Sequence, residues 1–327
     1  RDILTTAARN AETAVREYMS EFEADAYKQA EANGMEIRGH ALIWAQDQFT
    51  PDWVTAIDDP DELRQVMRIH ITTVMEHFAG RIHRWDVVNE PLQGLLDGPG
   101  VTMGDGVFQR VLGEGWLAEI FAVAREVDPD AELWLNEYGV DWAPGRHAAL
   151  LEAVTGWVAD GVSIDGLGMQ THRLTTGGPA VEGFAGQLQD YADLGLKIAL
   201  TEVDVPIPPD DPNALADQAG AYDRIFASCL AVAACEEVTM WGITDASTWL
   251  DGDLFEFLPK PTRPLLFDEE FQPKPAYDAV AARLATGRPS SEQPPTPTEP
   301  VEPPTSARPP SAPPGAQPVA GAPTYTG

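Results

Sequence analysis

The sequence predicts an α/β fold with a parallel sheet at its centre, because apolar strand-like runs alternate with helix-like stretches along most of its 327 residues. The expected strands cover residues 35–42, 83–89, 131–137, 164–172, 197–204 and 238–244. Strands of such a sheet are buried on both faces and therefore form continuous apolar runs, as residues 198–200 do. The first expected helix begins at the capping box of residues 20–23 and ends at Asn33 and Gly34.

Side chains that suit chemistry end every expected strand. They are His40 and Trp44 at the end of the first strand, Asn89 and Glu90 at the end of the second, Asn136 and Glu137 at the end of the third, Gln170 and His172 at the end of the fourth, Glu202 and Asp204 at the end of the fifth, and Trp241 and Asp245 at the end of the sixth. In an eight-stranded α/β barrel, the carboxyl ends of the strands and the loops behind them build the active site. The order of these endings therefore predicts a barrel with a site at this edge.

Two of these residues, Glu90 and Glu202, are the pair of carboxyl groups that a retaining glycosidase needs. One carboxylic acid protonates the leaving oxygen, and one carboxylate, about 5 Å away, attacks the sugar carbon from the opposite face. Each glutamate comes where an apolar strand-like run ends. The residues alone therefore predict glycoside hydrolysis, provided that the fold brings the two together.

Charge and composition restrict the partners. The net charge of −31 would repel nucleic acid, whereas a neutral polysaccharide would not be repelled. So acidic a composition is typical either of a protein adapted to high salt or of an ordinary acidic secreted protein, and both interpretations stay open. No uncharged apolar run approaches the roughly 18 residues that span a bilayer, so no membrane partner is expected. No set of His or carboxylate side chains shows metal-ligand spacing that glycosidase chemistry leaves unexplained, so neither a metal nor a cofactor is expected.

The two ends of the chain differ from its middle. Residues 287–327 are dominated by Pro, Thr, Ser, Ala, Glu and Gly, so we expect a disordered linker or tail behind a barrel of residues 1–286, leading to a lost or adjoining domain. Residues 1–20 show apolar positions at helical spacing. The chain begins at Arg1, without Met or a signal peptide. We therefore expect a processed or N-terminally truncated product.

Cys229 and Cys235 are the two cysteines of the chain. They can form a disulfide bond if the helix that carries Cys229 ends between them, and otherwise they are two buried thiols. The residues alone leave both alternatives open.

Six segments in a fixed order carry a resemblance to a known family. They are residues 33–40, 85–90, 168–172, 201–204, 241–245 and 265–277, and 202 − 90 = 112 positions separate the two glutamates. This pattern resembles glycoside hydrolase family 10, the retaining endo-β-1,4-xylanases, from Glu21 to about Ala281. The resemblance implies a (β/α)8 TIM barrel that lacks its first two strands here, because the first expected strand matches the third strand of the family.

The resemblance also implies roles for individual residues. It makes Glu90 the acid/base and Glu202 the nucleophile, with Asn89, His172 and Asp204 in support. Apolar neighbours and the charge of Glu202 agree with a proton on Glu90. The implied sugar-binding residues are His40, Trp44, Asn136, Gln170, Trp241 and Trp249. A disulfide between Cys229 and Cys235, a secreted protein and a xylan or xylo-oligosaccharide substrate are implied as well.

Two departures from the family pattern bear on activity. Ala45 stands where the family has a histidine after Trp44, which removes a hydrogen bond to the sugar. The two missing strands carry sugar-binding residues in the family; residues 1–20 or a second copy of the chain would have to fill the gap. Three functions therefore stay open: a xylanase, a glycosidase of the same mechanism acting on another β-1,4-glycan, and an impaired barrel that binds β-glycans without turnover.

Overall fold

The structure, a computed structural model, describes residues 27–30, 32–94, 101–178 and 181–288. Six parallel strands form one sheet in the order β1-β2-β5-β6-β7-β8. The strands are β1 (Arg38–Trp44), β2 (Arg84–Asn89), β5 (Glu132–Glu137), β6 (Gly166–Met169), β7 (Lys197–Val203) and β8 (Cys235–Met240). The expected helical segment at residues 1–20 and almost all of the expected tail at residues 287–327 lie outside the described residues.

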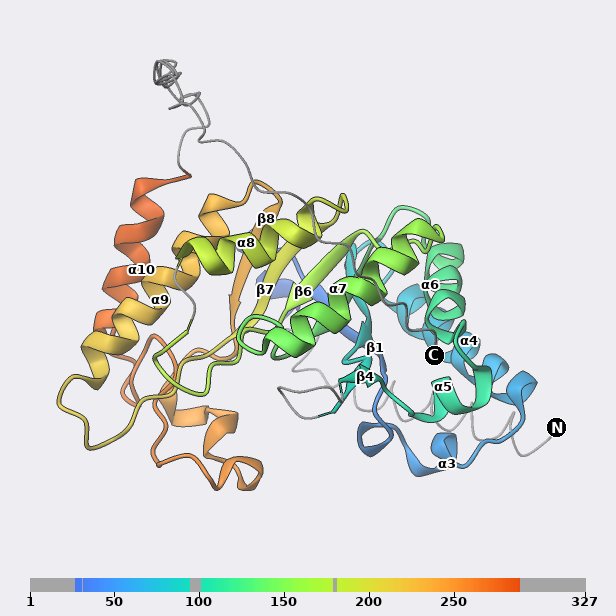
Figure 1. The fold of residues 1–327 in the computed structure, drawn as a ribbon, viewed down its shortest axis with the longest axis horizontal. Coiled ribbons are helices and arrows are strands. Elements are labelled where there is room, and N and C mark those ends of the chain that lie inside the picture. Colours follow the sequence, from blue (N-terminus) through green and yellow to red (C-terminus); the bar gives the residue numbers. More distant parts are fainter. Residues whose placement is uncertain (1–26, 31, 95–100, 179–180, 289–327) are drawn as a thin grey trace, which may run out of the picture. The chain divides into compact units, whose positions relative to one another are not determined.

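Helices follow the strands and surround the sheet (Figure 1). They are α3 (Asp52–Thr55), α4 (Pro60–His77), α5 (Val107–Leu112), α6 (Trp116–Val127), α7 (Pro144–Ala159), α8 (Val181–Ala192), α9 (Ala214–Ala231) and α10 (Pro275–Thr286). A short antiparallel pair, β3 (Leu92–Gln93) with β4 (Thr102–Met103), follows β2. In the part of the chain that the structure describes, no helix combines the length and the apolar character needed to cross a bilayer.

All six expected strands are present, and the bounds of each differ from those expected; the fourth, expected at residues 164–172, covers only Gly166–Met169. The first begins at Arg38 instead of residue 35, because Gly34 (φ +65°) closes the preceding helix and the Met35 N–H bonds back to Ala30 O at 2.9 Å. The sixth begins at Cys235 instead of residue 238, directly after the turn that follows α9, and ends before Gly242 (φ +134°). The boundaries of these two strands are therefore set by local turns and not by the pattern of apolar residues.

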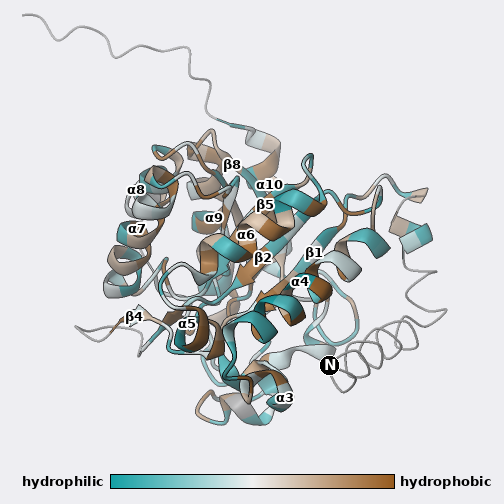
Figure 2. Ribbon diagram, turned by 90° about the vertical axis from the view of Figure 1, so that its right-hand side faces the viewer, coloured by the Kyte–Doolittle hydropathy of each residue, from teal (hydrophilic) through white to brown (hydrophobic). Residues whose placement is uncertain are grey.

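The helices bury one face against the sheet. In α4, Leu63, Met67, Ile71 and Met75 are all buried, and their spacing of four places them on one face of the helix. The Asp59 side chain caps this helix by accepting the Glu62 N–H at 2.9 Å. Figure 2 shows the resulting bands of hydrophobic and hydrophilic residues along α4. Burial of this face is what attaches the helix to the sheet.

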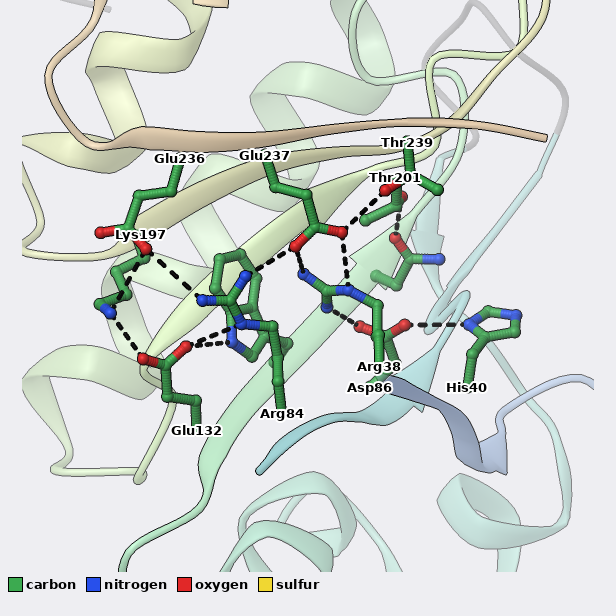
Figure 3. Close-up of polar contacts among 12 residues, drawn as sticks. Arg38, His40, Arg84, Asp86, Glu132, Lys197, Thr201, Glu236, Glu237 and Thr239 are labelled. Carbon is green, nitrogen blue, oxygen red and sulfur yellow. Dashed lines mark hydrogen bonds and ion pairs between the residues drawn. The ribbon is translucent and has the colours of Figure 1, made fainter. Parts of the chain in front are cut away.

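A polar layer near the amino ends of the strands connects the first and the last strand of the sheet (Figure 3). Arg38 of β1 and Arg84 of β2 both bind Glu237 of β8, with N–O distances of 2.9 and 2.7 Å. Arg84 also binds Glu132 of β5 at 2.9 Å, and Glu132 binds Lys197 of β7 at 2.6 Å. Because β1 and β8 are the two ends of the strand order, these contacts require a strongly curved sheet. The six described strands therefore form an open barrel.

Large aromatic rings fill the space beside this layer. The guanidinium groups of Arg38 and Arg84 lie 4.6 and 5.0 Å from the ring centroid of Trp134, which is fully buried. The same ring occupies the space above Gly166 in β6, where an added Cβ atom would lie 2.5 Å from the indole. Glycine is therefore required at position 166 by close packing.

We expect Gly166→Ala to lower the free energy of unfolding by about 1–3 kcal/mol, because the new methyl group forces either Trp134 or β6 to move. Gly186→Ala in α8 is the matched control, since an added Cβ there meets nothing within 4 Å. The control should be neutral or stabilising by up to about 1 kcal/mol. Urea unfolding followed by far-UV circular dichroism measures both, and equal midpoints for the two variants would contradict the packing argument.

Candidate active site

Glu90 lies immediately after β2 and is held by its backbone and by four donors. Its φ of +56° is in the left-handed region, and its N–H bonds to Asn136 O at 2.9 Å. Its Oε1 accepts from Gln170 Nε2 at 2.8 Å and from Asn89 Nδ2 at 3.3 Å. Its Oε2 accepts from Trp44 Nε1 at 3.1 Å and from Gln46 Nε2 at 2.9 Å. The carboxyl group is therefore fixed in direction.

Burial raises the pKa of Glu90 above its ordinary value, since only 9% of the residue is exposed. The hydrogen bonds from Gln170 and Trp44 act in the opposite direction because they favour the carboxylate, and the charge of Glu202 raises the pKa further. The environment as a whole favours a proton on Glu90. This is the property required of a general acid.

One carboxyl oxygen of Glu202, in β7, contacts an amide group, and the other contacts an imidazole ring. Its Oε1 accepts from Asn136 Nδ2 at 2.7 Å, and its Oε2 lies 3.0 Å from His172 Nε2. The other ring nitrogen, His172 Nδ1, lies 2.9 Å from Asp204 Oδ2, which also accepts from Trp249 Nε1 at 2.8 Å. Glu202 is therefore surrounded by groups that stabilise a carboxylate.

The surroundings of His172 favour its positively charged form. Burial alone would lower its pKa, but the charges and hydrogen bonds of Asp204 and Glu202 outweigh burial and raise the pKa to about 10. The imidazolium donates toward Glu202 while Asp204 fixes the orientation of the ring.

A continuous amide network joins the two glutamates. Asn136 Nδ2 donates to Asn89 Oδ1 at 2.9 Å as well as to Glu202, and Gln170 Nε2 lies 3.4 Å from Asn89 Oδ1 while it bonds Glu90. Asn89, Asn136 and Gln170 are all buried. The positions of the two carboxyl groups are therefore coupled through three side chains from three different strand ends.

Aromatic rings line the same edge of the sheet. Trp241 contacts His40 edge-on at a centroid distance of 5.6 Å and His172 at 6.2 Å. Trp249 contacts His172 at 4.7 Å and is 38% exposed. His40 Nδ1 lies 3.0 Å from Asp86 Oδ2. Partly exposed flat rings beside buried carboxyl groups form a surface suited to the apolar faces of a sugar ring.

The structure thus brings together the residues that the sequence singled out at the strand ends, with the exception of Asp245, which pairs with Lys274 at 2.8 Å and accepts the Leu265 N–H at 2.8 Å. Cys229 and Cys235 lie elsewhere: they form a disulfide bond with an S–S distance of 2.04 Å, between the end of α9 and the first residue of β8. This bond is at the amino end of β8, away from the edge that carries the glutamates. Among the described residues, no three His, Cys, Asp or Glu side chains are arranged to hold a metal ion.

Two contacts of Glu90 or its surroundings were not predicted from the sequence. Gln46 bonds Glu90 directly. Its neighbour Ala45, which replaces the histidine of the family pattern, is buried with 6% exposure. Glu137 accepts the Leu92 N–H at 2.9 Å and pairs with buried Arg146 at 2.8 Å, so it supports the segment after Glu90. Burial raises the pKa of Glu137 to about 7 in spite of Arg146. Gln46 follows β1 and Glu137 ends β5, and this position at a strand end is the one feature of the sequence that could have indicated their contacts.

An open α/β barrel with two coupled glutamates at the carboxyl ends of its strands is the arrangement of a glycoside hydrolase. The sequence profile of Glycosyl hydrolase family 10 matches residues 9–283. The chain therefore belongs to glycosyl hydrolase family 10.

Individual relatives agree with this family. Endo-1,4-beta-xylanase 3 of Hypocrea jecorina is 38% identical over 257 residues, which are 78% of this chain; the chain spans 66% of that relative, just under two thirds of its length. The crystal structure of native xylanase 10B from Thermotoga maritima superposes with a TM-score of 0.72 at 33% identity, covering 81% of this chain and 79% of that one. Xylanase 10B from Thermotoga petrophila in complex with xylobiose gives a TM-score of 0.72 at 32% identity, covering 81% and 78%.

We expect His172 to make stability depend on pH in the alkaline range. Its pKa in the folded protein, about 10, is above the ordinary value of 6.5, so its contribution is complete below pH 6.5 and is lost as the pH rises through 10. The free energy of unfolding should therefore fall less between pH 7 and pH 10.5 in His172→Gln than in the parent.

Urea unfolding at a series of pH values measures this dependence. His83→Gln, at an exposed histidine outside the network, is the control and should follow the parent. A parallel fall in the parent and in His172→Gln would show that the imidazolium is not what couples stability to pH.

Proposed function

We propose that this chain is an endo-β-1,4-xylanase that hydrolyses xylan with retention of configuration. The observation that carries the proposal is the coupled pair of buried glutamates, one in surroundings that favour a proton and the other bonded to an imidazolium. Double displacement needs one carboxyl group in each of these states.

In the first step, Glu90 gives its proton to the glycosidic oxygen while a Glu202 oxygen attacks the anomeric carbon, and a covalent glycosyl-enzyme forms. In the second step, Glu90 takes a proton from water, and this water displaces Glu202 from the sugar. Asn89, whose amide lies between the two glutamates, is placed to bond the 2-hydroxyl of the sugar in the transition state. His172 holds Glu202 in position for attack.

Binding of the substrate is assigned to the rings and polar groups around the glutamates. Trp241 and Trp249 would pack against pyranose faces, and His40, Trp44, Asn136 and Gln170 would orient the sugar. The name of the Hypocrea relative and the xylobiose in the Thermotoga petrophila structure support xylan over other β-1,4-glycans. The disulfide bond fits a secreted protein, since such bonds persist in oxidising surroundings. A catalytic barrel at 1–286 with a linker at 287–327 completes the proposed organisation.

Binding of β-glycans without turnover is the second candidate function. It is favoured by one observation: within the described sheet, β1 and β8 are edge strands, so one side of the barrel is open. In a closed barrel, the strands that fill this side supply further sugar-binding groups.

Reducing-sugar release from xylan separates the two candidates. The parent should release sugar, and Glu202→Ala should lose this activity by about 10⁴-fold or more while it melts at a similar temperature, because the nucleophile is gone and the fold is not. Carboxymethylcellulose and mannan serve as substrate controls. Cooperative melting with no release by the parent would instead favour the binding candidate.

Azide assigns the two glutamates to their roles. With an aryl xyloside, whose leaving group needs no proton, Glu90→Ala still forms the glycosyl-enzyme, and azide then gives the β-configured glycosyl azide. In Glu202→Ala, azide attacks in place of the carboxylate and gives the α-configured product. Proton NMR of the products distinguishes the two anomers, and the opposite pattern would exchange the roles of Glu90 and Glu202.

A further inference from the structure

We propose that the side-chain amide of Gln46 reverses with the protonation state of Glu90, so that its N–H supports the carboxylate and its C=O accepts the proton of the acid. The proposal rests on the acid/base role proposed for Glu90. Gln46 then acts as a positioning residue that keeps both forms of the acid/base hydrogen-bonded.

The need for such a residue comes from the surroundings of Glu90. Both carboxyl oxygens face N–H groups: Gln170 and Asn89 at Oε1, and Trp44 and Gln46 at Oε2. Four donors suit a carboxylate, but a carboxylic acid has an O–H that needs an acceptor. A buried O–H without an acceptor is unfavourable, so at least one of the four partners must be able to reverse.

The partners of Oε1 cannot reverse without breaking other bonds. Gln170 Nε2 also faces Asn89 Oδ1, so a reversed Gln170 would set two oxygens against each other. Asn89 Oδ1 is fixed by Asn136 Nδ2, and Asn136 Oδ1 is fixed by the Thr201 hydroxyl at 2.6 Å. These amides are therefore locked as donors.

The two partners of Glu90 Oε2 differ: one can only donate a hydrogen bond, and the other can either donate or accept. The Trp44 indole N–H can only donate. The Gln46 amide can reverse, because the groups at its other end can change from donor to acceptor. Gln46 Oε1 accepts from Gln48 Nε2 at 2.9 Å, and Gln48 is exposed and free to turn its own amide. Gln46 also donates toward the Tyr138 hydroxyl, which can turn to donate in its place when the amide reverses.

The backbone that carries Gln46 is held in place while the amide turns. Asp47 accepts the Val107 N–H at 2.6 Å and binds Arg110 at 3.1 Å, which ties the turn after β1 to α5. Gly106 approaches the Ala45 carbonyl so closely that an added Cβ would lie 2.2 Å from it. The reversal is therefore a rotation of one amide group and not a movement of the loop.

The reversal fits the direction of proton transfer. In the free acid, the proton on Oε2 points to the Gln46 carbonyl. When substrate is bound, the glycosidic oxygen takes this proton as its bond to the sugar breaks, and the Gln46 N–H then bonds the carboxylate left behind. In the second step the proton from water returns to Oε2. The proton is conserved and no further reactant is needed.

Other charged or titratable groups also act on Glu90 and are common to every variant below. They are Glu202 of β7, His172 after β6, and Glu137 and Tyr138 at the end of β5.

Gln46→Met keeps the size of the side chain and removes both hydrogen bonds. The lost bond to the carboxylate is charge-assisted and about twice as strong as the lost bond to the acid, so the pKa of Glu90 should rise. We expect the alkaline limb of kcat/KM on xylo-oligosaccharides to move up by about one pH unit. Gln189→Met, on the surface of α8, should leave the limb in place.

NMR tests the reversal without activity. In protein labelled with ¹⁵N in its glutamine side chains, the Gln46 amide signals, assigned by their loss in Gln46→Met, should titrate with the ¹³C carboxyl signal of Glu90 and stop titrating in Glu90→Gln. Gln46 signals that ignore pH, or an unmoved alkaline limb in Gln46→Met, would overturn the proposal. If the parent hydrolyses no xylan, the proposed function fails, and the NMR titration still decides whether Gln46 follows Glu90.

Discussion

The site depends on the orientation of one buried amide, the side chain of Asn136. Its Oδ1 accepts the Thr201 hydroxyl, and its Nδ2 bonds both Asn89 and Glu202, so its direction is fixed by three contacts. This close packing also explains Gly168 in the neighbouring strand, where an added Cβ would lie 2.4 Å from Asn136 Oδ1. Asn89 and Gln170, the two donors to Glu90 Oε1, are oriented in turn by the Asn136 amide, because Asn136 fixes Asn89 Oδ1 and Gln170 faces that oxygen. Sheet packing and the chemistry of the glutamates are thus linked at one residue.

The ion pairs that stabilise the sheet and the two glutamates lie at opposite ends of the strands. The ion pairs of Arg38, Arg84 and Glu237 connect β1, β2 and β8 near the amino ends, while the glutamates lie at the carboxyl ends. A cavity of about 420 Å³, lined mainly by apolar side chains, lies beside edge strand β1 and α4 and not at the glutamates. The sheet therefore keeps its curvature through polar contacts across its concave side, although its edges are open within the described residues.

Periodicity and strand endings were enough to predict that six strands form and which residues meet at their ends, except for Asp245, which pairs with Lys274. They could not predict Gln46, because its reach to Glu90 depends on the turn at residues 47–49 and on the tie from Asp47 to α5. They could not predict the pair of Glu137 and Arg146 either, since the two meet only after α7 packs on the sheet. The shifted bounds of β1 and β8 have the same origin: turns are set by single residues that apolar patterns do not register.

In the proposed mechanism, the charges around Glu90 explain how one carboxyl group could serve as both acid and base. In the free protein the charge of Glu202 adds to burial in raising the pKa of Glu90. Formation of the proposed glycosyl-enzyme turns Glu202 into a neutral ester, so that contribution disappears, while the imidazolium of His172 remains nearby. The pKa of Glu90 must then fall, and the group that gave up a proton becomes able to take one from water. The alternation thus follows from the charge balance between two glutamates and one histidine, without any movement of the backbone.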